Sequence, residues 1–431
     1  MTDAVGRIHA AFDAIDDADP AIFIAVCDRD AAIAAVDPTL PLAGTTFVAK
    51  NNIDIEWVPT TAGCPSYAYQ PAASAPAVQR LIDAGATCLG ATNLDQFATG
   101  LVGTRSPYGV PQNVIDPALI PGGSSSGSAV AVARGIADIG LGTDTAGSGR
   151  VPAAQNRIVG VKPTRGLVPT RGVVPAVRSL DCVSIFARDV STAAQGLDVL
   201  AGFDAEDPWS QHAGAAPLVM PTLRVGVPAA VEAASDLDAS AWRASVEQLA
   251  ALAFVEIVEV DLDPFVEAGQ LLYGGPWVAE RYAAVGEFLS TGPAGADPTV
   301  AAIIGAAAGR TAVEAYEAQY RLAELRRLAD HVWTLLDVIM MPTVAQVPPE
   351  LGHLGMDLDV DTLFPRVIDW ACFTPYANAT GTPSISLPLG HDPATNCPVG
   401  MTFGARTGQD RLLLELALQL EQAQPWRRIT A

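Results

Sequence analysis

Pro121-Gly-Gly-Ser-Ser-Ser-Gly-Ser128 and Gly140-Leu-Gly-Thr-Asp-Thr-Ala-Gly-Ser-Gly-Arg150 are the two stretches around which the rest of the chain is arranged. Between them, the apolar residues 129–133 predict a helix, Gly135 predicts the left-handed residue that ends it, and residues 136–141 predict a buried strand. Such a helix–strand unit holds two Gly- and Ser-rich turns on either side of one rigid element. Because both turns then offer hydroxyl and backbone N–H groups to a common point, we interpret them as a functional site.

The composition describes a long and strongly acidic chain. It has 431 residues, half of them hydrophobic, and a formal net charge of −22. Nucleic acids and anionic membranes bind basic patches, so this charge predicts neither of them as a partner. The N-terminus is rich in Asp, unlike a secretory signal, and no apolar run approaches the ~20 residues of a membrane span. We therefore expect a cytoplasmic protein.

Six cysteines are spread over the chain and form no Cys-x-x-Cys pair and no Cys/His cluster with metal-ligand spacing. The sequence therefore predicts neither a metal site nor a cofactor. We expect reduced, mostly buried thiols at these positions: Cys27, Cys64, Cys88, Cys182, Cys372 and Cys397.

Helix and strand signals divide the chain into three parts. Strands and helices alternate over residues 1–228, which contain both turns, whereas helices dominate residues 229–337 and include a long one from 312 to about 336. Strands return over residues 338–431, before a last helix. Because strands from both ends flank the helical part, we expect one interleaved domain in which 229–337 form a helical lobe.

The two turns, together with Val161-Lys-Pro-Thr164, resemble the amidase signature of Ser-Ser-Lys hydrolases, and Asp144-Thr-Ala-Gly-Ser-Gly-Arg-Val-Pro-Ala153 is most similar to the allophanate hydrolase branch. The resemblance implies an α/β fold with a large mixed sheet flanked by helices on both faces. It also implies hydrolysis of the terminal amide of allophanate (urea-1-carboxylate), with an acyl-enzyme and release of ammonia. Allophanate hydrolases usually carry a further C-terminal domain; we expect none here, which leaves the fate of the product open.

The resemblance also implies a catalytic set. None of the five histidines stands in the Gly/Ser turns, which disfavours a Ser-His-Asp triad and leaves a lysine as the better base. By resemblance, Ser148 is the nucleophile, Ser124 relays the proton from an unusual cis peptide, and Lys50 is the final base. As a base Lys50 must be neutral, so burial has to lower its pKa from about 10.4. The plainer alternatives are a helix N-cap for Ser148, a turn residue for Ser124 and an exposed charge for Lys50.

The backbone of the second turn is predicted to stabilise the reaction. The N–H groups of Thr145, Ala146 and Gly147 would form the oxyanion hole, because small residues allow a carbonyl oxygen to approach. Asp144 and Arg150 are expected to be structural, with the Asp144 carboxylate holding the turn through backbone hydrogen bonds.

Leu271-Leu-Tyr-Gly-Gly-Pro-Trp-Val-Ala-Glu-Arg-Tyr282 resembles the stretch in which allophanate hydrolases bind the substrate carboxylate. The corresponding side chains are Tyr273 and Arg281, and we add Gly123 to the predicted substrate-binding residues. The alternative is structural: Arg281 stacks on Trp277 one helical turn earlier, and Tyr273 fills the core.

Other functions remain open on the sequence. The same fold could serve a different small amide, a glutaminase or an A-type amidotransferase subunit, or it could be an inactive scaffold. A phosphate-binding loop is disfavoured because Gly127 is followed by Ser128 where that motif needs lysine. The partner we expect is a small anionic ureide substrate; a homodimer and a separate protein that handles the carboxylated product are left open.

Overall fold

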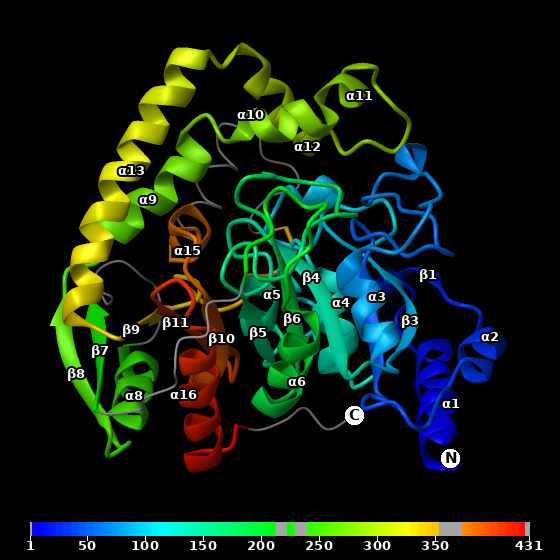
Figure 1. Cartoon of the computed structure of the whole chain (residues 1–431), viewed down its shortest axis with the longest axis horizontal. Coiled ribbons are helices and arrows are strands. Elements are labelled where there is room, and N and C mark those ends of the chain that lie inside the picture. Colours follow the sequence, from blue (N-terminus) through cyan, green and yellow to red (C-terminus); the bar gives the residue numbers. More distant parts are fainter. Residues whose placement is uncertain (1, 213–221, 229–238, 353–372, 427–431) are drawn as a thin grey trace.

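A mixed β-sheet of eleven strands organises the computed structural model, which describes residues 2–212, 222–228, 239–352 and 373–426 (Figure 1). The strand order is β1-β3-β2-β4-β6-β5-β10-β11-β9-β7-β8. The pairs β2–β3, β2–β4, β7–β8 and β7–β9 are parallel and the others antiparallel. The strands are β1 (Phe23–Val26), β2 (Thr46–Lys50), β3 (Thr87–Thr92), β4 (Ile139–Asp144), β5 (Val159–Lys162), β6 (Cys182–Ala187), β7 (Leu223–Pro228), β8 (Val255–Val260), β9 (Val338–Pro342), β10 (Ser384–His391) and β11 (Pro398–Ala405).

Helices cover both faces of this sheet. Side chains of adjacent strand residues point to opposite faces, and in β2 Phe47 and Ala49 pack into one buried cluster while Val48 packs into another. The first cluster takes residues from α3, α6, α8 and α16, and the second takes residues from α1 and α4. The prediction of a mixed sheet flanked on both faces is confirmed. The helices are α1 (Thr2–Asp16), α2 (Arg29–Ala34), α3 (Pro76–Asp83), α4 (Ser126–Ala133), α5 (Val151–Gln155), α6 (Val190–Leu200), α8 (Ala239–Ala250), α9 (Asp263–Gly274), α10 (Val278–Arg281), α11 (Glu287–Ser290), α12 (Pro298–Gly305), α13 (Ala312–Leu335), α15 (Tyr376–Thr380) and α16 (Asp410–Ala423).

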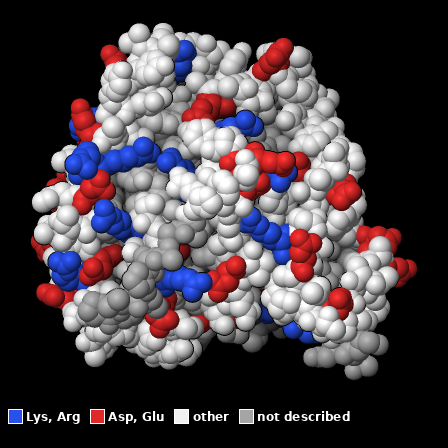
Figure 2. Space-filling view, in the orientation of Figure 1, with Lys and Arg blue, Asp and Glu red and all other residues white. Residues whose placement is uncertain are grey.

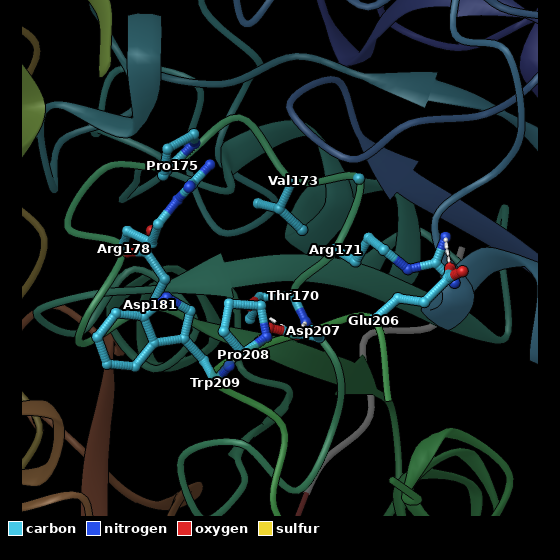
Figure 3. Close-up of a pocket in the computed structure, with 11 residues that line it drawn as sticks. Thr170, Arg171, Val173, Pro175, Arg178, Asp181, Glu206, Asp207, Pro208 and Trp209 are labelled. Atoms are coloured by element: carbon cyan, nitrogen blue, oxygen red, sulfur yellow. Dashed lines mark hydrogen bonds and ion pairs between the residues drawn. The ribbon is translucent and has the colours of Figure 1, made fainter. Parts of the chain in front are cut away.

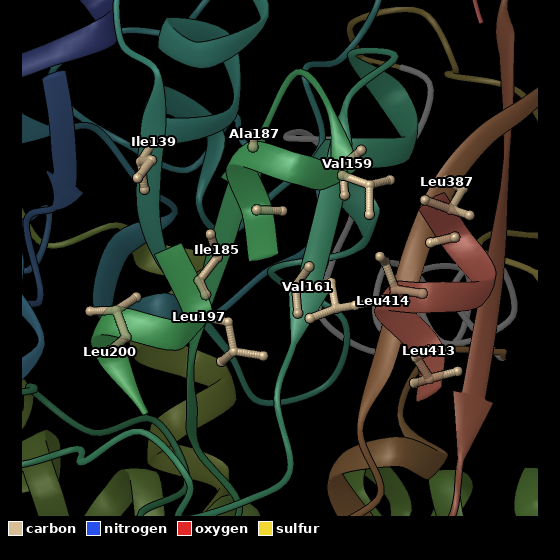
Figure 4. Packing of buried hydrophobic residues seen from close by; sticks show 14 of the residues in the cluster. Ile139, Val159, Val161, Ile185, Ala187, Leu197, Leu200, Leu387, Leu413 and Leu414 are labelled. Carbon is tan, nitrogen blue, oxygen red and sulfur yellow. The ribbon is translucent and has the colours of Figure 1, made fainter. Parts of the chain in front are cut away.

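The larger of these clusters joins the two ends of the chain. Figure 4 shows Val161 and Ile185 of the central strands beside Leu197 of α6, with Leu387 of β10 and Leu413 of α16 in the same cluster. Each of these side chains is less than 5 % exposed. Each Å² of buried apolar surface stabilises the fold by about 25 cal/mol. This cluster therefore stabilises the packing of strands from residues 46–187 together with strands from residues 338–405.

The helices of residues 263–335 lie together at one end of the molecule, with α13 as the longest (Figure 1). A capping box between Thr311 and Glu314 begins α13. Helices dominate the described part of residues 229–337, as expected, but this part also contributes the strand β8 to the sheet. Its Val-Glu-Ile-Val-Glu-Val pattern is short and interrupted by two glutamates, so only the pairing with β7 makes it a strand. Residues 229–238 of the expected lobe lie outside the described part.

The helix between the two turns ends as predicted. Gly135 has φ +74°, and the N–H of Ile136 donates to the carbonyl of Ala131, which is the pattern of a glycine-ended helix. This turn occupies residues 135–138, so β4 begins at Ile139 and reaches Asp144, later than the expected strand at 136–141. The shift brings the end of β4 directly to the second Gly/Ser turn.

The surface carries both signs of charge. Figure 2 shows Lys and Arg side chains interspersed with Asp and Glu on one face. Within the described ranges, none of the helices combines the length and the apolar character needed to cross a bilayer.

Candidate active site

Lys50 stands at the end of β2 and is fully buried. Its Nζ is 2.7 Å from Ser124 Oγ and 2.8 Å from Thr143 Oγ1. Burial penalises the charged amine and lowers the pKa of Lys50 to about 7, while the carboxylate of Asp95 acts in the opposite direction. At neutral pH a substantial fraction of the amine is therefore uncharged and can accept a proton from Ser124.

The second turn, residues 144–150, is held by a buried ion pair. Arg150 Nε and Nη2 donate to the Asp144 carboxylate at 2.9 and 3.0 Å, and the same carboxylate accepts the N–H groups of Gly147 and Gly149. Burial by itself would raise the pKa of Asp144, but Arg150 outweighs this effect and the pKa is lowered. The expected structural role of Asp144 and Arg150 is confirmed by these contacts.

A segment from the far end of the chain braces this turn. Thr374 Oγ1 donates to the carbonyl of Ala146 at 2.7 Å, and Asn378 Nδ2 donates to the carbonyl of Asp144 at 2.7 Å. Gly147 has φ +123°, and a Cβ there would lie 2.3 Å from Thr374 Oγ1. The turn therefore requires glycine at this position, both for its backbone angle and for space.

The two Gly/Ser turns lie against each other. Ser125 Oγ donates to the carbonyl of Thr143 at 3.2 Å, and a Cβ on Gly122 would lie 2.9 Å from the Cα of Pro152 in α5. Ser148 precedes α5 within the second turn and is 3 % exposed. The peptide bond before Ser124 is cis. The fold thus brings the turns that carry the two predicted serines together, with Lys50 touching the first.

Two of the predicted contact residues use their N–H groups within the protein. The N–H of Gly147 donates to Asp144 Oδ1 at 2.9 Å. The N–H of Gly123 donates to the carbonyl of Leu101 at 2.7 Å. The assignment of Thr145, Ala146 and Gly147 to the oxyanion hole and of Gly123 to the substrate site stays a prediction.

Tyr273 and Arg281 line one narrow cavity together with Arg105. Arg281 is 7 % and Arg105 is 5 % exposed, and among the described residues no carboxylate lies within 4.0 Å of either guanidinium. Arg281 Nη1 donates to the hydroxyl of Thr99 at 2.9 Å, and Arg105 Nη1 donates to the Thr99 carbonyl at 3.1 Å. Buried charges are normally paired, so two guanidinium groups without a carboxylate favour a small anion in this cavity.

Tyr273 connects this cavity to buried clusters that contain Ala146 of the second turn and Val151 of α5. Tyr273 packs against the buried cluster that contains Ala146, and burial raises the pKa of its phenol, which keeps the hydroxyl protonated as a donor. The alternative stacking of Arg281 on Trp277 is absent from the contacts of the described residues.

A second cavity of about 220 Å³ is lined by residues from 170–181 and 206–209 (Figure 3). Asp181 lines it beside Arg178 and Trp209. Asp181 Oδ1 accepts the hydroxyl of Thr145 at 2.5 Å, and burial raises the pKa of Asp181 to about 6. Asp181 therefore orients one of the predicted oxyanion residues through its side chain.

Sequence reasoning missed several residues of this site. Arg105, Thr143, Asp181 and Thr374 contact the predicted residues or line the same cavity, but they were not singled out from the sequence. Thr143 could have been found, because it lies within the stretch 140–150 that carries the second turn. Cys372, two residues before Thr374, lies outside the described part of the chain.

Comparisons with known proteins agree with this architecture. A sequence model of the family described as Amidase matches residues 16–414. Urea amidolyase of Lachancea kluyveri is 40 % identical over 383 residues, which cover 88 % of this chain and 20 % of that protein. The chain thus spans about one fifth of the length of this relative. The A-type subunit of glutamyl-tRNA(Gln) amidotransferase from Halobacterium salinarum is 34 % identical over 407 residues, covering 86 % of this chain and 94 % of that protein.

Solved structures point in the same direction. Kluyveromyces lactis allophanate hydrolase has a TM-score of 0.88 and 35 % identity, over 99 % of this chain and 72 % of that chain. The fold of this chain is therefore similar to that of the Kluyveromyces lactis protein over nearly its whole length. The chain belongs to the amidase family and is an enzyme that hydrolyses carbon–nitrogen bonds other than peptide bonds.

Proposed function

We propose that the enzyme cleaves the terminal amide of allophanate through a Ser148 nucleophile, with Ser124 as proton relay and Lys50 as base. The observation that carries the proposal is the buried Lys50 amine, 2.7 Å from Ser124 Oγ and with a pKa of about 7. An exposed lysine would be almost fully charged at neutral pH and could not accept a proton. A general base works best when its pKa lies near the operating pH, as this one does.

In the first half of the reaction, Ser148 Oγ bonds to the amide carbon as its proton passes to Ser124 and the Ser124 proton passes to Lys50. The oxygen of the tetrahedral intermediate takes the negative charge, and the N–H groups of Thr145 and Ala146 would donate to it. The C–N bond then breaks, the Lys50 proton returns through Ser124 to the nitrogen, and ammonia leaves. Water then attacks the acyl-Ser148 ester by the same relay and releases the carboxylated product.

The cavity of Tyr273, Arg281 and Arg105 supports an anionic substrate. Allophanate is small and offers little apolar surface, so its recognition depends on its carboxylate. Arg281 uses only Nη1 toward described residues, which leaves Nε and Nη2 for a carboxylate. Because the chain has a net charge of −22, long-range electrostatics oppose an anion and the local guanidinium groups must compensate.

An amidotransferase subunit of the A type is the second candidate. It is favoured by one observation: the matched region spans 94 % of the Halobacterium salinarum protein. A glutamine-derived substrate would carry its charges farther from the scissile amide than allophanate does. The buried guanidinium groups of Arg105 and Arg281, which line one narrow cavity, favour the smaller anion.

Ammonia release from matched substrates tests the proposal. Purified enzyme should release ammonia from allophanate faster than from biuret, glutamine or acetamide, and Ser148→Ala should release none. If the wild type ignores allophanate but hydrolyses an uncharged amide, the family activity stands and the substrate assignment fails. Ammonia release from glutamine only in the presence of partner proteins would favour the second candidate.

A further inference from the structure

A pair of thiols lies outside the catalytic region. Cys27 directly follows the edge strand β1, its N–H donates to the carbonyl of Leu89 in β3 at 2.9 Å, and Cys88 stands one residue before Leu89. The Cys27 and Cys88 Sγ atoms are 3.9 Å apart. We propose that these two thiols form a peroxide-sensitive pair, in which a small hydroperoxide oxidises Cys27 and Cys88 then forms a disulfide with it, joining the residue after β1 to β3.

The pair can be reached from solvent through a cavity of about 420 Å³, which both cysteines line. Its rim includes Val26 and Trp57, which are 45 % and 49 % exposed, and the remaining lining is mainly small and apolar. The two cysteines are themselves only 7 % and 5 % exposed, so they lie on the cavity floor. A molecule the size of hydrogen peroxide fits this space, whereas a folded protein reductant or oxidant does not.

The surroundings of the two sulfur atoms differ. Trp57 Nε1 donates to Cys27 Sγ at 3.2 Å, so Cys27 has contacts with both Cys88 and an indole donor. The hydrogen bond with Cys88 and then that from Trp57 lower the pKa of Cys27 against the effect of burial, while the same bond and burial raise the pKa of Cys88. Asp28 lines the cavity and opposes a negative sulfur, but it is exposed to solvent. Thiolate character therefore concentrates on Cys27, which is the thiol that a peroxide oxidises.

The other described cysteines lack this arrangement. Cys64 contacts the hydroxyl of Ser66, and Cys182 contacts Lys162, while no second thiol lies within 4.0 Å of Cys64, Cys182 or Cys397 in the described ranges. A sulfenic acid formed at any of these three would have no neighbouring described thiol to resolve it.

The chemistry balances in two steps. The Cys27 thiolate attacks one peroxide oxygen, the O–O bond breaks, and the products are the Cys27 sulfenic acid and, after protonation of the hydroxide released, water. The Cys88 thiol then attacks the Cys27 sulfur, the S–O bond breaks, and a second water leaves as the S–S bond forms. Together, two thiols lose two hydrogen atoms and one peroxide is reduced to two waters.

Mass spectrometry of the whole chain tests the proposal without any activity assay. After treatment with hydrogen peroxide and alkylation of the remaining thiols, digestion without reductant should yield one cross-linked peptide pair joining Cys27 to Cys88. In Cys88→Ser, dimedone should label Cys27, and in Cys27→Ser it should leave Cys88 unlabelled. Cys64→Ser and Cys397→Ser are the matched controls and should form the cross-link as the wild type does.

The oxidation rates of individual cysteines distinguish a selective thiol pair from general oxidation of the protein. Cys27 should react at least ~10-fold faster than Cys64, and Trp57→Phe, which removes one donor, should slow its oxidation. Absence of the cross-linked peptide in the wild type, equal oxidation of Cys64 and Cys27, or dimedone labelling of Cys88 in place of Cys27 would each overturn the proposal.

Discussion

Lys50 Nζ lies 2.7 Å from Ser124 Oγ, although 74 residues separate the two along the chain. The contact is formed because β2 ends beside the first Gly/Ser turn and β4 carries Thr143 to the other side of the amine. Full burial of an amine between two hydroxyl groups is costly for its charged form. The same geometry that makes Lys50 a competent base therefore also makes it a source of instability, and both effects can be measured.

Ser148→Ala should abolish amide hydrolysis with little change in the fold, because it removes the proposed nucleophile and only one small polar atom. We expect kcat to fall by several orders of magnitude, while circular dichroism stays that of the wild type. A fluorophosphonate should form its covalent adduct on Ser148. The matched control is Ser126→Ala, since the Ser126 hydroxyl is buried and has no hydrogen-bond partner among the described residues. Labelling of another serine would remove Ser148 from the mechanism.

The pH dependence follows from the pKa of Lys50. The neutral amine is the reactive form, so kcat/KM should rise with pH and reach half of its plateau near pH 7. Lys50→Met should lose this activity. Lys162→Met is the control: Lys162 is equally buried, but its Nζ contacts the Pro163 carbonyl and Cys182 Sγ. Suppose instead that Lys162→Met shifted the pH at which kcat/KM reaches half of its plateau, while Lys50→Met kept the wild-type pH dependence. Lys162, and not Lys50, would then be the base.

Lys50→Met should also make the protein more stable at pH 7. A pKa lowered from 10.5 to about 7 corresponds to a cost of about 5 kcal/mol, and the two lost hydrogen bonds offset ~1 kcal/mol each, which leaves a gain of ~2–3 kcal/mol. Between pH 7 and 10.5 the unfolded chain binds a proton that the folded chain does not, so wild-type stability should rise with pH across this window. Urea unfolding at pH 7 and pH 9.5 measures both effects; an equal pH slope in the variant would contradict the burial argument.

Arg281→Ala should lower kcat/KM more for anionic substrates than for uncharged ones. The loss in kcat/KM for allophanate should correspond to ~1.5–3 kcal/mol, the range for hydrogen bonds to a charged group, and it should shrink for uncharged biuret. Arg105→Ala should act in the same direction. Arg80→Ala is a suitable control, because Arg80 donates to the carbonyls of Leu200 and Gly202 away from the cavity. Equal losses for allophanate and biuret in Arg281→Ala would indicate a structural role.

Gly147→Ala should disrupt the second turn. The new Cβ would lie 2.3 Å from Thr374 Oγ1 at a φ of +123°, where an L side chain is strained, so we expect loss of activity and a lower Tm. Gly274→Ala provides the matched control, because a Cβ at the end of α9 meets nothing within 4 Å. If the Gly147→Ala variant kept normal activity and Tm, the turn would have room for a side chain at this position, and the steric argument from Thr374 would be wrong.

The resemblance of the two Gly/Ser turns to the amidase signature was sufficient for the fold class, and apolar patterns were sufficient for most of the elements. Apolar periodicity predicted the helix and strand between the turns, and glycine at position 135 predicted where the helix ends. These features depend on local backbone preferences and on the spacing of apolar residues, which can be read along the chain. The edge strand β8 was missed because its interrupted pattern becomes a strand only through pairing with β7.

The site was predictable only in part, for a physical reason. A motif identifies residues such as Ser124 and Ser148 because they are close to glycines that the turns require. The pKa of Lys50, the contact of the Gly147 N–H with Asp144 and the guanidinium of Arg105 beside that of Arg281 depend on the tertiary fold. Desolvation and hydrogen-bond partners are properties of packed neighbours, so only the tertiary structure decided which of the predicted groups are available for chemistry.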